Sequence, residues 1–328
     1  MSITILIPTK NRHLFLDRIL KFYSLSNLNY NLIVIDSSDA SSKIKNLAII
    51  KKYNKLNLKY YFTIGWTTEV MRHVSKKIKT KYCCFAGDDD FVIKDGLQKC
   101  ETFLNKDKSF IGCMGNIILY NIQDKNKFIN EYSSINKRIE TNSYDRVINH
   151  INDYSVLHFS LTRSKYFKEA LNSVAPYKMR QLCPSRHVND EYILSFSLAA
   201  LGKFEKIDAL QVVRVVGHQN HIKITYNEEL NISVKYMFKK LNFLINKTNK
   251  HQKLIKKNED NFLENFKNMV IKKEKKQNYI FFTKNFLKMI KFYNFIKMIK
   301  KFFTNNRLNN YKKKYKSQLK IFHRVHNL

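Results

Sequence analysis

The fold of this chain is indicated most clearly by residues 82–91, which read Tyr-Cys-Cys-Phe-Ala-Gly-Asp-Asp-Asp-Phe. The first half of this segment is a short apolar run, typical of a buried strand. The run ends at Gly87, and Asp88, Asp89 and Asp90 follow directly. Adjacent carboxylates repel one another unless a divalent cation or a dense set of donors neutralises them. The segment therefore predicts a buried strand that ends at a site for a hard cation carrying phosphate oxygens.

Similar apolar runs occur upstream, separated by segments with helical spacing of apolar residues. This alternation with short connections predicts βαβ units and a parallel sheet covered on both faces. Ligands of such sheets bind beyond the carboxyl ends of the strands. The predicted strands cover residues 2–8, 31–36, 58–64 and 81–86. Helices are predicted over residues 12–26 and 67–79. A further helix between them is capped by Ser41 or Ser42 and carries Ile44 and Leu47. Three polar strand ends therefore share one edge, at Pro8-Thr9, at residues 36–39 and at residues 88–90.

The elements predicted downstream are less regular, and residues 125–150 are too polar to assign. Strands are expected over residues 109–122, 155–161 and 204–216, and helices over 93–106, 164–173 and 187–201. After residue 229, lysines alternate with large apolar residues and almost no glycine or proline occurs. Helices are expected there over residues 230–245, 259–271 and 279–303.

The chain is strongly basic, with 60 Lys and Arg against 26 Asp and Glu and a net charge of +34. Residues 231–328 hold 26 of the basic and 4 of the acidic side chains, a net charge of +22. Such an excess favours attraction to an anionic membrane surface, nucleic acid or phosphate-bearing substrates. Compositional drift toward Lys, Asn, Ile, Phe and Tyr is the alternative, and it explains the last third less well because acidic residues are so rare there.

The cysteines and the hydropathy of the chain indicate the cellular compartment in which the protein is expected. The five cysteines form no CxxC pair, and most lie in or beside apolar runs, so reduced and buried thiols are expected. No signal peptide is expected, since Lys10 and Arg12 follow the first apolar run. No run approaches the ~20 apolar residues of a membrane-spanning helix. We expect a cytoplasmic protein, held peripherally on the inner face of the cytoplasmic membrane.

Three motifs resemble those of family 2-like glycosyltransferases of the GT-A fold, in the same order and with compatible spacing. They are residues 5–12 (ILIPTKNR), 34–38 (VIDSS) and 87–91 (GDDDF). The closest likeness is to a bacterial subgroup with a Pro-Thr-Lys-Asn-Arg start and an Asp-Asp-Asp-Phe site, and it covers residues 1–221. The resemblance implies an α/β fold of GT-A type, Rossmann-like, with a mostly parallel central sheet flanked by helices. The catalytic domain would span residues 1–229, divided into a nucleotide-sugar half (1–122) and an acceptor half (123–229), before a basic α-helical extension (230–328).

The resemblance also implies roles for the polar strand ends. The metal, Mn²⁺ or Mg²⁺, would be held by Asp88 and Asp90, with Asp88 and Asp89 also binding the nucleotide-sugar. Asp36 would accept a hydrogen bond from the base of the donor. Pro8 and Thr9 would line the same pocket, and Arg72 would reach a phosphate. From the residues alone, an acidic turn that caps a helix, a strand-end turn at Asp36 and a solvated helical arginine are the alternatives.

Sugar transfer with inversion needs a carboxylate that removes the proton of the acceptor hydroxyl. By resemblance, Glu191 is the favoured base, because Leu194 and Gly202 follow it at the family's spacing, and Asp190 is the second candidate. The alternative is that both acids only favour the first turn of a helix through its dipole. His218 would complete the metal shell or touch the diphosphate, and a structural histidine is the alternative there.

The sequence thus predicts a metal-dependent, inverting glycosyltransferase with a nucleotide-sugar donor and a surface-glycan or lipid-linked acceptor. The basic extension would contact an anionic membrane surface through amphipathic helices. Packing of the extension on the catalytic domain is the alternative, and nucleic acid is not expected because no nucleic-acid motif occurs. Two other functions stay open. One is a non-catalytic basic docking protein, and the other is a nucleotidyl or phosphoryl transferase that uses the same acidic cluster.

Overall fold

A computed structural model of the chain describes residues 1–121, 128–131, 136–176, 181–185, 188–216, 227–248, 260, 262–271 and 313–325. Its centre is a mixed nine-stranded sheet with the order β3-β2-β1-β4-β8-β6-β9-β5, with β7 paired to β6. The strands are β1 (Ile3–Thr9), β2 (Asn31–Asp36), β3 (Leu58–Phe62), β4 (Tyr82–Phe85), β5 (Asp90–Val92), β6 (Phe110–Asn121), β7 (Phe128–Glu131), β8 (Leu161–Arg163) and β9 (Lys203–Val216).

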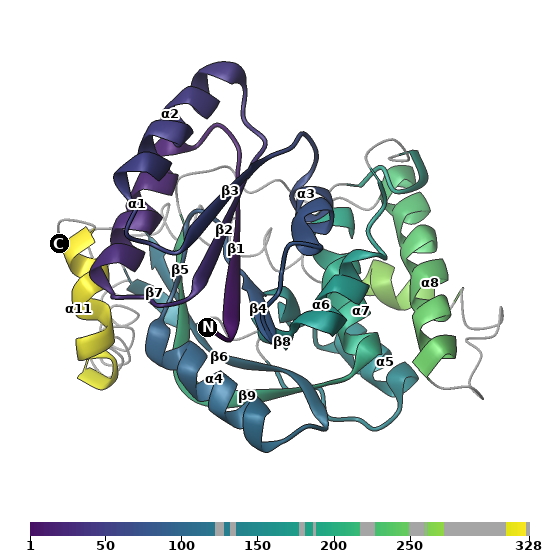
Figure 1. Cartoon of the computed structure of the whole chain (residues 1–328). Coiled ribbons are helices and arrows are strands. Elements are labelled where there is room, and N and C mark those ends of the chain that lie inside the picture. Colours follow the sequence, from purple (N-terminus) through teal and green to yellow (C-terminus); the bar gives the residue numbers. More distant parts are fainter. Residues whose placement is uncertain are drawn as a thin grey trace, which may run out of the picture.

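Helices cover both sides of this sheet (Figure 1). In the view of Figure 1, α1 and α2 lie on one side of the strands β1–β3, and α3, α6 and α7 lie on the other. The helices are α1 (His13–Leu25), α2 (Ala40–Lys52), α3 (Thr67–Ser75), α4 (Lys94–Lys106), α5 (Ser143–Asn152), α6 (Ser164–Leu171), α7 (Ile193–Leu201), α8 (Glu228–Thr248) and α11 (Lys316–Val325).

The first four strands pair as the sequence predicts. β1 runs parallel to β2 and to β4, and β2 runs parallel to β3. Thr9 lies opposite Asp36 in this register, and Leu6 lies opposite Phe85. The polar residues that follow β1, β2 and β4 therefore meet at one edge of the sheet.

The second half of the sheet mixes the two directions. β8 is antiparallel to both β4 and β6, whereas β6 and β9 pair in parallel along most of their length. β5 returns antiparallel to β9. Asp90, the last of the three aspartates, therefore lies opposite Arg214 near the end of β9. The parallel pairing expected from the sequence thus holds from β3 to β4, and beyond β4 the sheet combines antiparallel pairs with the parallel pair of β6 and β9.

Helix α4 packs very closely on β9 at Gly96. A Cβ atom at this position would lie 2.1 Å from the carbonyl oxygen of Leu210, so only glycine allows the two backbones to approach this far. Because β9 and α4 are fixed together, the carboxyl end of β9 is held at a defined place beside β5.

Two local predictions differ from the structure. The strand predicted over residues 155–161 is a 3₁₀ turn, η1 (Leu157–Phe159), and β8 begins only at Leu161. Serine side chains explain the difference, since Ser160 Oγ donates to the carbonyl of Leu157 and so competes with pairing in the sheet.

Helix α2 begins differently from the prediction as well. Its N-cap is Asp39, whose carboxylate accepts from the backbone N–H of Ser42 at 2.8 Å. The buried side of α2 carries Ser42 and Asn46, while Ile44 is 69% exposed. Asn46 turns inward because it donates a hydrogen bond to Asp36 in the core.

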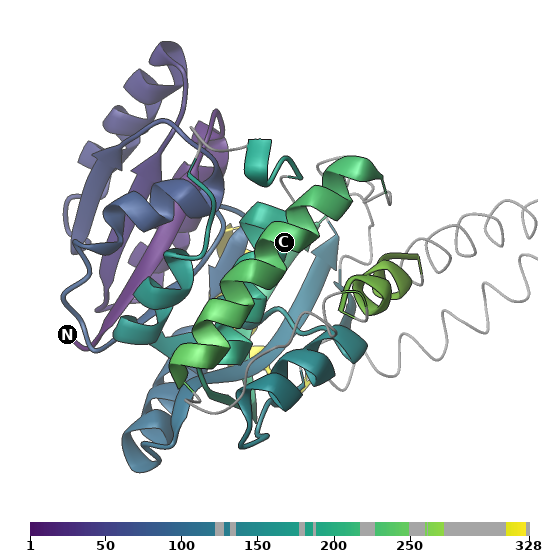
Figure 2. The ribbon, with the colours of Figure 1, turned by 90° about the vertical axis from the view of Figure 1, so that its right-hand side faces the viewer.

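The described helices of the C-terminal third pack on the rest of the protein. α8 lies against α7 and α5 (Figure 2), and α11 lies against α1 (Figure 1). Residues 262–271 are helical, and Phe262 and Phe266 in this segment are buried. These side chains belong to the same hydrophobic core as the strands. The described part of the extension is therefore a packed cap, and the predicted helix over residues 279–303 lies outside the described residues.

Two further expectations concern cysteines and membrane spans. All five cysteines are free and buried, as the sequence predicts. Among the described helices, none has the combination of length and hydropathy that crossing a bilayer requires.

Candidate active site

A cleft of about 580 Å³ opens at the carboxyl edge of the strands β1 and β4. Residues that the sequence analysis selects independently converge on it. They include Pro8 and Thr9 from β1, all three aspartates after β4, and the acidic pair near residue 190. Their common cleft supports the expectation that polar strand ends form one site. The other polar residues of the lining are Lys10, Arg12, Ser37, Trp66, Thr67, His158 and Arg214.

Residues 87–90, which we call the acidic turn, are anchored to β1 by a side-chain hydrogen bond and closed by a backbone hydrogen bond. Thr9 donates from Oγ1 to Asp88 Oδ2 at 2.7 Å, which joins the ends of β1 and β4. The backbone N–H of Asp90 donates to the carbonyl of Gly87 at 3.1 Å. Asp88 and Asp90 are buried, whereas Asp89 is only half-buried. Two of the three carboxylates are therefore held in fixed positions on the floor of the cleft.

Two arginines neutralise much of the charge of this turn. Arg12 contacts Asp88 at 3.1 Å and Asp89 at 2.7 Å, and its guanidinium also lies over the ring of Phe15. Arg214 stands opposite Asp90 in the pairing of β5 with β9 and donates from Nε to Oδ1 at 3.0 Å. These contacts supply the dense donor set that a cluster of carboxylates requires.

The carboxyl groups of the turn remain costly to ionise in spite of these partners. Burial raises the pKa of Asp88 to about 7, against the lowering effect of Arg12. Burial likewise raises the pKa of Asp90 to about 6, against the lowering effect of Arg214. The charge on Asp89 adds to both shifts. A further cation at the turn would therefore be strongly favoured.

The turn also has the space and the chemistry that a divalent metal needs. A Cβ atom at Gly87 would lie 2.7 Å from Asp90 Oδ2 and 2.9 Å from Asp89 Oδ1, so two carboxylate oxygens converge on the space that glycine leaves. Carboxylate oxygens are the ligands that Mg²⁺ and Mn²⁺ prefer. Within the described ranges, no group of three or more His, Cys, Asp or Glu side chains is placed to hold an ion. The aspartates of the turn could hold such an ion only together with oxygens from a phosphate-bearing ligand.

The acidic pair lies on a π-helical turn, η3 (Val188–Tyr192), that leads into α7. Such turns are frequent at functional sites. Asp190 Oδ1 accepts from the backbone N–H of Thr68 at 3.2 Å and from its hydroxyl at 3.0 Å, in the first turn of α3. Asp190 therefore holds α3 in place, as a capping residue does.

Glu191 takes a different orientation from Asp190. Its Oε1 accepts a hydrogen bond from the hydroxyl of Tyr154 at 2.9 Å, and the residue lines the cleft. His158 also lines the cleft, with Nδ1 3.1 Å from the hydroxyl of Ser195. Burial lowers the pKa of His158 to about 4, although nearby Glu191 raises it, so the imidazole is neutral near pH 7. Both acids line the cleft, but the carboxylate of Glu191 is held by Tyr154, whereas that of Asp190 is bonded to Thr68 of α3.

Two predicted site residues do not line the cleft. Asp36 is completely buried, and its carboxylate accepts from Ser38 N, Asn46 Nδ2 and Tyr60 OH at 2.7–2.9 Å. It therefore organises the end of β2, and its neighbour Ser37 reaches the cleft instead.

Arg72 is the second predicted site residue that does not line the cleft. Arg72 donates to the carbonyl of Val174 at 3.2 Å, which ties α3 to the segment after α6 and directs the guanidinium away from the cleft lining. His218 lies outside the described residues, so its predicted role stays a prediction.

Several cleft residues were not assigned by sequence reasoning. Arg12 belongs to the first motif but carried no predicted role, although a basic residue next to a polar strand end is a usable signal. Arg214 has a weaker signal, a lone charge in the apolar strand β9. His158 lies within the strand predicted over residues 155–161, and Tyr154, which bonds Glu191 at the cleft, directly precedes it; nothing in the sequence marks either residue.

Comparison with known proteins addresses the fold. No protein-family model matches the chain, and no curated protein matches it in sequence. The chain is similar to solved structures of S. aureus TarS. For residues 1–349 of TarS in complex with UDP-GlcNAc, the TM-score is 0.55 and the identity 18%, over 82% of this chain and 72% of that one. For the same segment with UDP, the TM-score is 0.51 and the identity 16%, over 81% and 70% of the two chains. A longer TarS structure gives a TM-score of 0.52 and an identity of 16%, over 82% and 43%.

This likeness concerns the fold. TarS has the GT-A fold, and the mixed sheet flanked by helices in this chain matches it. The predicted fold class is confirmed, while the roles of individual residues rest on the geometry of the cleft.

Proposed function

We propose that this protein is a glycosyltransferase that moves a sugar from a nucleotide-sugar donor to an acceptor hydroxyl, with inversion and with a divalent metal. One observation carries the proposal. Thr9, the acidic turn after β4 and the carboxylate of Glu191 come from distant parts of the chain and line the same cleft. The GT-A fold and the UDP-GlcNAc and UDP complexes of TarS make a uridine nucleotide-sugar the first donor to test.

The donor diphosphate would lie over the acidic turn. Lys10, Arg12 and Arg214 bring cationic side chains to the cleft and would contact its oxygens. Mn²⁺ or Mg²⁺ would be held by Asp88 and Asp90, with Asp89 beside them, and it would act as a Lewis acid that stabilises charge on the departing diphosphate. Pro8 and Thr9 would form a wall of the same pocket. Contact of Asp36 or Arg72 with the donor would require both side chains to leave their present partners.

Glu191 would act as the general base. The acceptor oxygen would form a bond to the anomeric carbon, its proton would pass to the carboxylate of Glu191, and the bond from that carbon to the phosphate oxygen would break. The nucleoside diphosphate would leave with the electron pair of that bond. The hydrogen bond from Tyr154 fixes the orientation of Glu191 before the acceptor arrives. Asp190 has a positioning role through Thr68.

The acceptor and the location are proposed from charge. A surface-glycan or lipid-linked acceptor would bring the reaction to the inner face of the cytoplasmic membrane, where anionic lipids attract basic segments. The net charge of +22 over residues 231–328 supports such peripheral contact. Because α8 is part of the core, deleting everything after residue 231 would damage the fold. Membrane contact is therefore tested by replacing lysines within residues 279–303 by glutamine, which should weaken flotation of the protein with anionic vesicles.

The function is tested by a screen of nucleotide-sugars with Mn²⁺ or Mg²⁺ and an assay for the released nucleotide. The proposed glycosyltransferase releases a nucleoside diphosphate only when donor, metal and an acceptor hydroxyl (or water, in slow hydrolysis) are present, and Asp90→Ala abolishes the release. Release of pyrophosphate or free phosphate would favour a nucleotidyl or phosphoryl transferase instead. A protein that binds no nucleotide in the presence of metal would contradict both enzyme proposals.

A further inference from the structure

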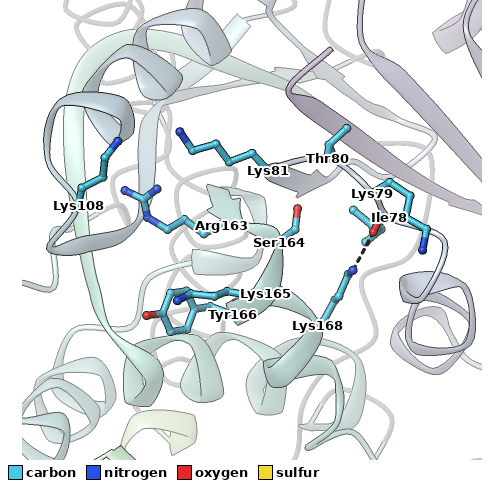
Figure 3. Close-up of a pocket in the computed structure, with 10 residues that line it drawn as sticks. All are labelled: Ile78, Lys79, Thr80, Lys81, Lys108, Arg163, Ser164, Lys165, Tyr166 and Lys168. Atoms are coloured by element: carbon cyan, nitrogen blue, oxygen red, sulfur yellow. Dashed lines mark hydrogen bonds between the residues drawn. The ribbon is translucent and has the colours of Figure 1, made fainter.

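A second cavity, of about 680 Å³, lies at the other end of β4 from the candidate active site. The segment that enters β4, residues 78–81, forms one wall, and Arg163 at the end of β8 forms another because β8 is antiparallel to β4. The first turn of α6 forms the floor (Figure 3). The donor cleft begins beyond the carboxyl end of the same strand, so the two cavities face opposite edges of the sheet.

The lining of this second cavity, which we call the basic pocket, contains six cationic side chains and no acidic one. They come from separate parts of the chain and surround one space in Figure 3. The six are Lys79, Lys81, Lys108, Arg163, Lys165 and Lys168.

The partners of these cations are neutral groups. Lys81 Nζ donates to the amide oxygen of Asn105 at 2.6 Å, and Lys168 Nζ donates to the carbonyl of Ile78 at 2.8 Å. Arg163 donates to backbone carbonyls, including that of Leu104 at 2.7 Å. Within the described part of the chain, none of the six forms an ion pair with a carboxylate. Asp107 lies near enough to Arg163 to interact with it electrostatically, but this single carboxylate leaves most of the positive charge of the pocket unbalanced.

Mutual repulsion is visible at one of these lysines. Slight desolvation and the charges of Lys81 and Arg163 lower the pKa of Lys108, although its side chain is exposed. An anion bound between these side chains would relieve that repulsion.

The floor of the basic pocket adds directional donors. Helix α6 starts at Ser164, whose backbone N–H donates to the carbonyl of Lys81 at 2.9 Å, and its N-cap residue Arg163 makes no side-chain capping bond, so the start of the helix adds a partial positive charge. Ser164 is 5% exposed, and its hydroxyl has no hydrogen-bond partner among the oxygen and nitrogen atoms of the described residues. The buried thiol of Cys83 beside it is a weak partner. In Figure 3 Ser164 lies between Lys81 and Lys168, and its hydroxyl is buried against β4.

We propose that the basic pocket binds a phosphate group, as a phosphomonoester or a phosphodiester, that is separate from the donor. Six cationic side chains around one cavity suit an anion with several acceptor oxygens better than a single carboxylate. β4 has four residues, which span about 13 Å at ~3.3 Å per residue. A ligand here is therefore too far from the acidic turn to be the diphosphate of the bound donor. Its phosphate belongs to a soluble phosphate ester or to the head group of an anionic lipid.

The test compares two triple variants of the full-length protein that change net charge equally. Lys81, Lys108 and Lys165 in the basic pocket are exposed, and replacing all three by glutamine leaves the active-site cleft intact. The control replaces Lys21, Lys51 and Lys55, which are exposed on the side of α1 and α2, by glutamine. One arm titrates glycerol 3-phosphate by isothermal titration calorimetry. The other measures sedimentation with phosphatidylglycerol vesicles against phosphatidylcholine vesicles.

We expect the pocket variant to bind about tenfold more weakly than the wild type in at least one arm, since hydrogen bonds to charged groups are lost. The affinity of the control variant should stay within about twofold of the wild type, because its lysines lie outside the pocket and contribute only to the overall positive charge, which salt screens. A loss with glycerol 3-phosphate assigns the pocket to a soluble ester, and a loss confined to phosphatidylglycerol vesicles assigns it to a lipid head group. Equal behaviour of the two variants in both arms would overturn the proposal.

Discussion

Arg214 and Asp90 stand opposite each other on the paired strands β9 and β5, with Nε of the arginine 3.0 Å from Oδ1 of the aspartate. The aspartate is 5% exposed and the arginine 31%, so the pair closes the floor of the cleft and still faces the ligand space. The guanidinium also lies over the ring of Phe159, which fixes its plane. A cation of the protein itself thus holds the acidic turn in shape before any ligand binds.

Arg214→Gln should destabilise the protein, because it leaves the carboxylate of Asp90 buried without its partner. Removing one member of a buried ion pair costs about 3–5 kcal/mol, and the partial exposure of Arg214 reduces this to about 2–3 kcal/mol. Urea denaturation at pH 7.5 measures the change. Arg214→Lys keeps the charge and should lose less than half as much. Equal stability of the glutamine variant and the wild type would show that solvent satisfies Asp90.

Asp88→Asn should stabilise the protein at neutral pH and flatten its dependence on pH. Burial raises the pKa of Asp88 in the folded protein to about 7, well above the ordinary value of an aspartate, so the stabilising contribution of the protonated group is full below about pH 4 and is lost as the pH rises through 7. The asparagine has no charge to bury. We expect a gain on the order of a few kcal/mol at pH 8 and almost none at pH 4.

Thermal unfolding between pH 4 and 8 measures this effect, and Mn²⁺ provides its control. The ion should raise the melting temperature of the wild type at pH 8 more than that of Asp88→Asn, because it favours the ionised carboxylate. If the wild type loses no stability between pH 5 and 8 relative to the variant, the proposed cost of ionising Asp88 is absent.

Glu191→Gln and Asp190→Asn should separate a catalytic from a positioning role. If Glu191 removes the acceptor proton, its amide should lower kcat by about 10²–10⁴-fold and leave donor binding unchanged. Asp190→Asn should cost about 1 kcal/mol of stability, because the first turn of α3 loses a charged acceptor, and it should lower kcat far less. Nucleotide release with the best donor, together with donor affinity from calorimetry, distinguishes the two. A larger loss of kcat for Asp190→Asn would exchange the roles.

The parts of this fold that sequence reasoning recovers are those governed by local patterns. The first four strands, α1 and the carboxyl-edge position of Thr9 and Asp88 follow from apolar runs and from the rule that parallel strands end at one edge. The acidic turn stands out because charged residues follow an apolar run, and Glu191 is indicated by the family resemblance through the spacing of Leu194 and Gly202. Each of these signals lies within a few residues of the chain.

The parts that were missed depend on contacts between distant segments. Arg214 meets Asp90 only because β9 and β5 pair, and Asn46 turns toward Asp36 only after α2 has folded over β2. The packing of α11 on α1 joins residues some three hundred positions apart. In the last third, lysine and large apolar residues at helical spacing suit a membrane surface and a packed cap equally, and only the fold buries Phe322.

Tyr154→Phe should reduce turnover through its effect on Glu191. The phenol donates to Oε1 at 2.9 Å, and this bond stabilises the ionised carboxylate. Its loss should raise the pKa of the base, shift the acidic limb of the kcat profile to higher pH and lower kcat by about tenfold. Tyr30→Phe is the matched control, because the buried hydroxyl of Tyr30 has no hydrogen-bond partner in the described structure. An unshifted pH profile with lower activity would indicate a purely structural role for Tyr154.

Phe322→Ala should destabilise the protein and weaken donor binding, although the residue lies six positions from the end of the chain. Phe322 is fully buried, and its ring meets the rings of Phe91 at 5.1 Å and Tyr120 at 4.9 Å. Loss of such a ring costs about 3–5 kcal/mol. Phe91 directly follows Asp90, so the cavity would also loosen the strand that positions the acidic turn.

Phe243→Ala, at a phenylalanine of α8 that is 67% exposed, is the control and should cost less than about 0.5 kcal/mol. Urea denaturation and donor affinity measured on both variants decide the case. If both variants lost equally little, α11 would rest on the core without supporting it, and the C-terminal helix would be available for a role away from the catalytic domain.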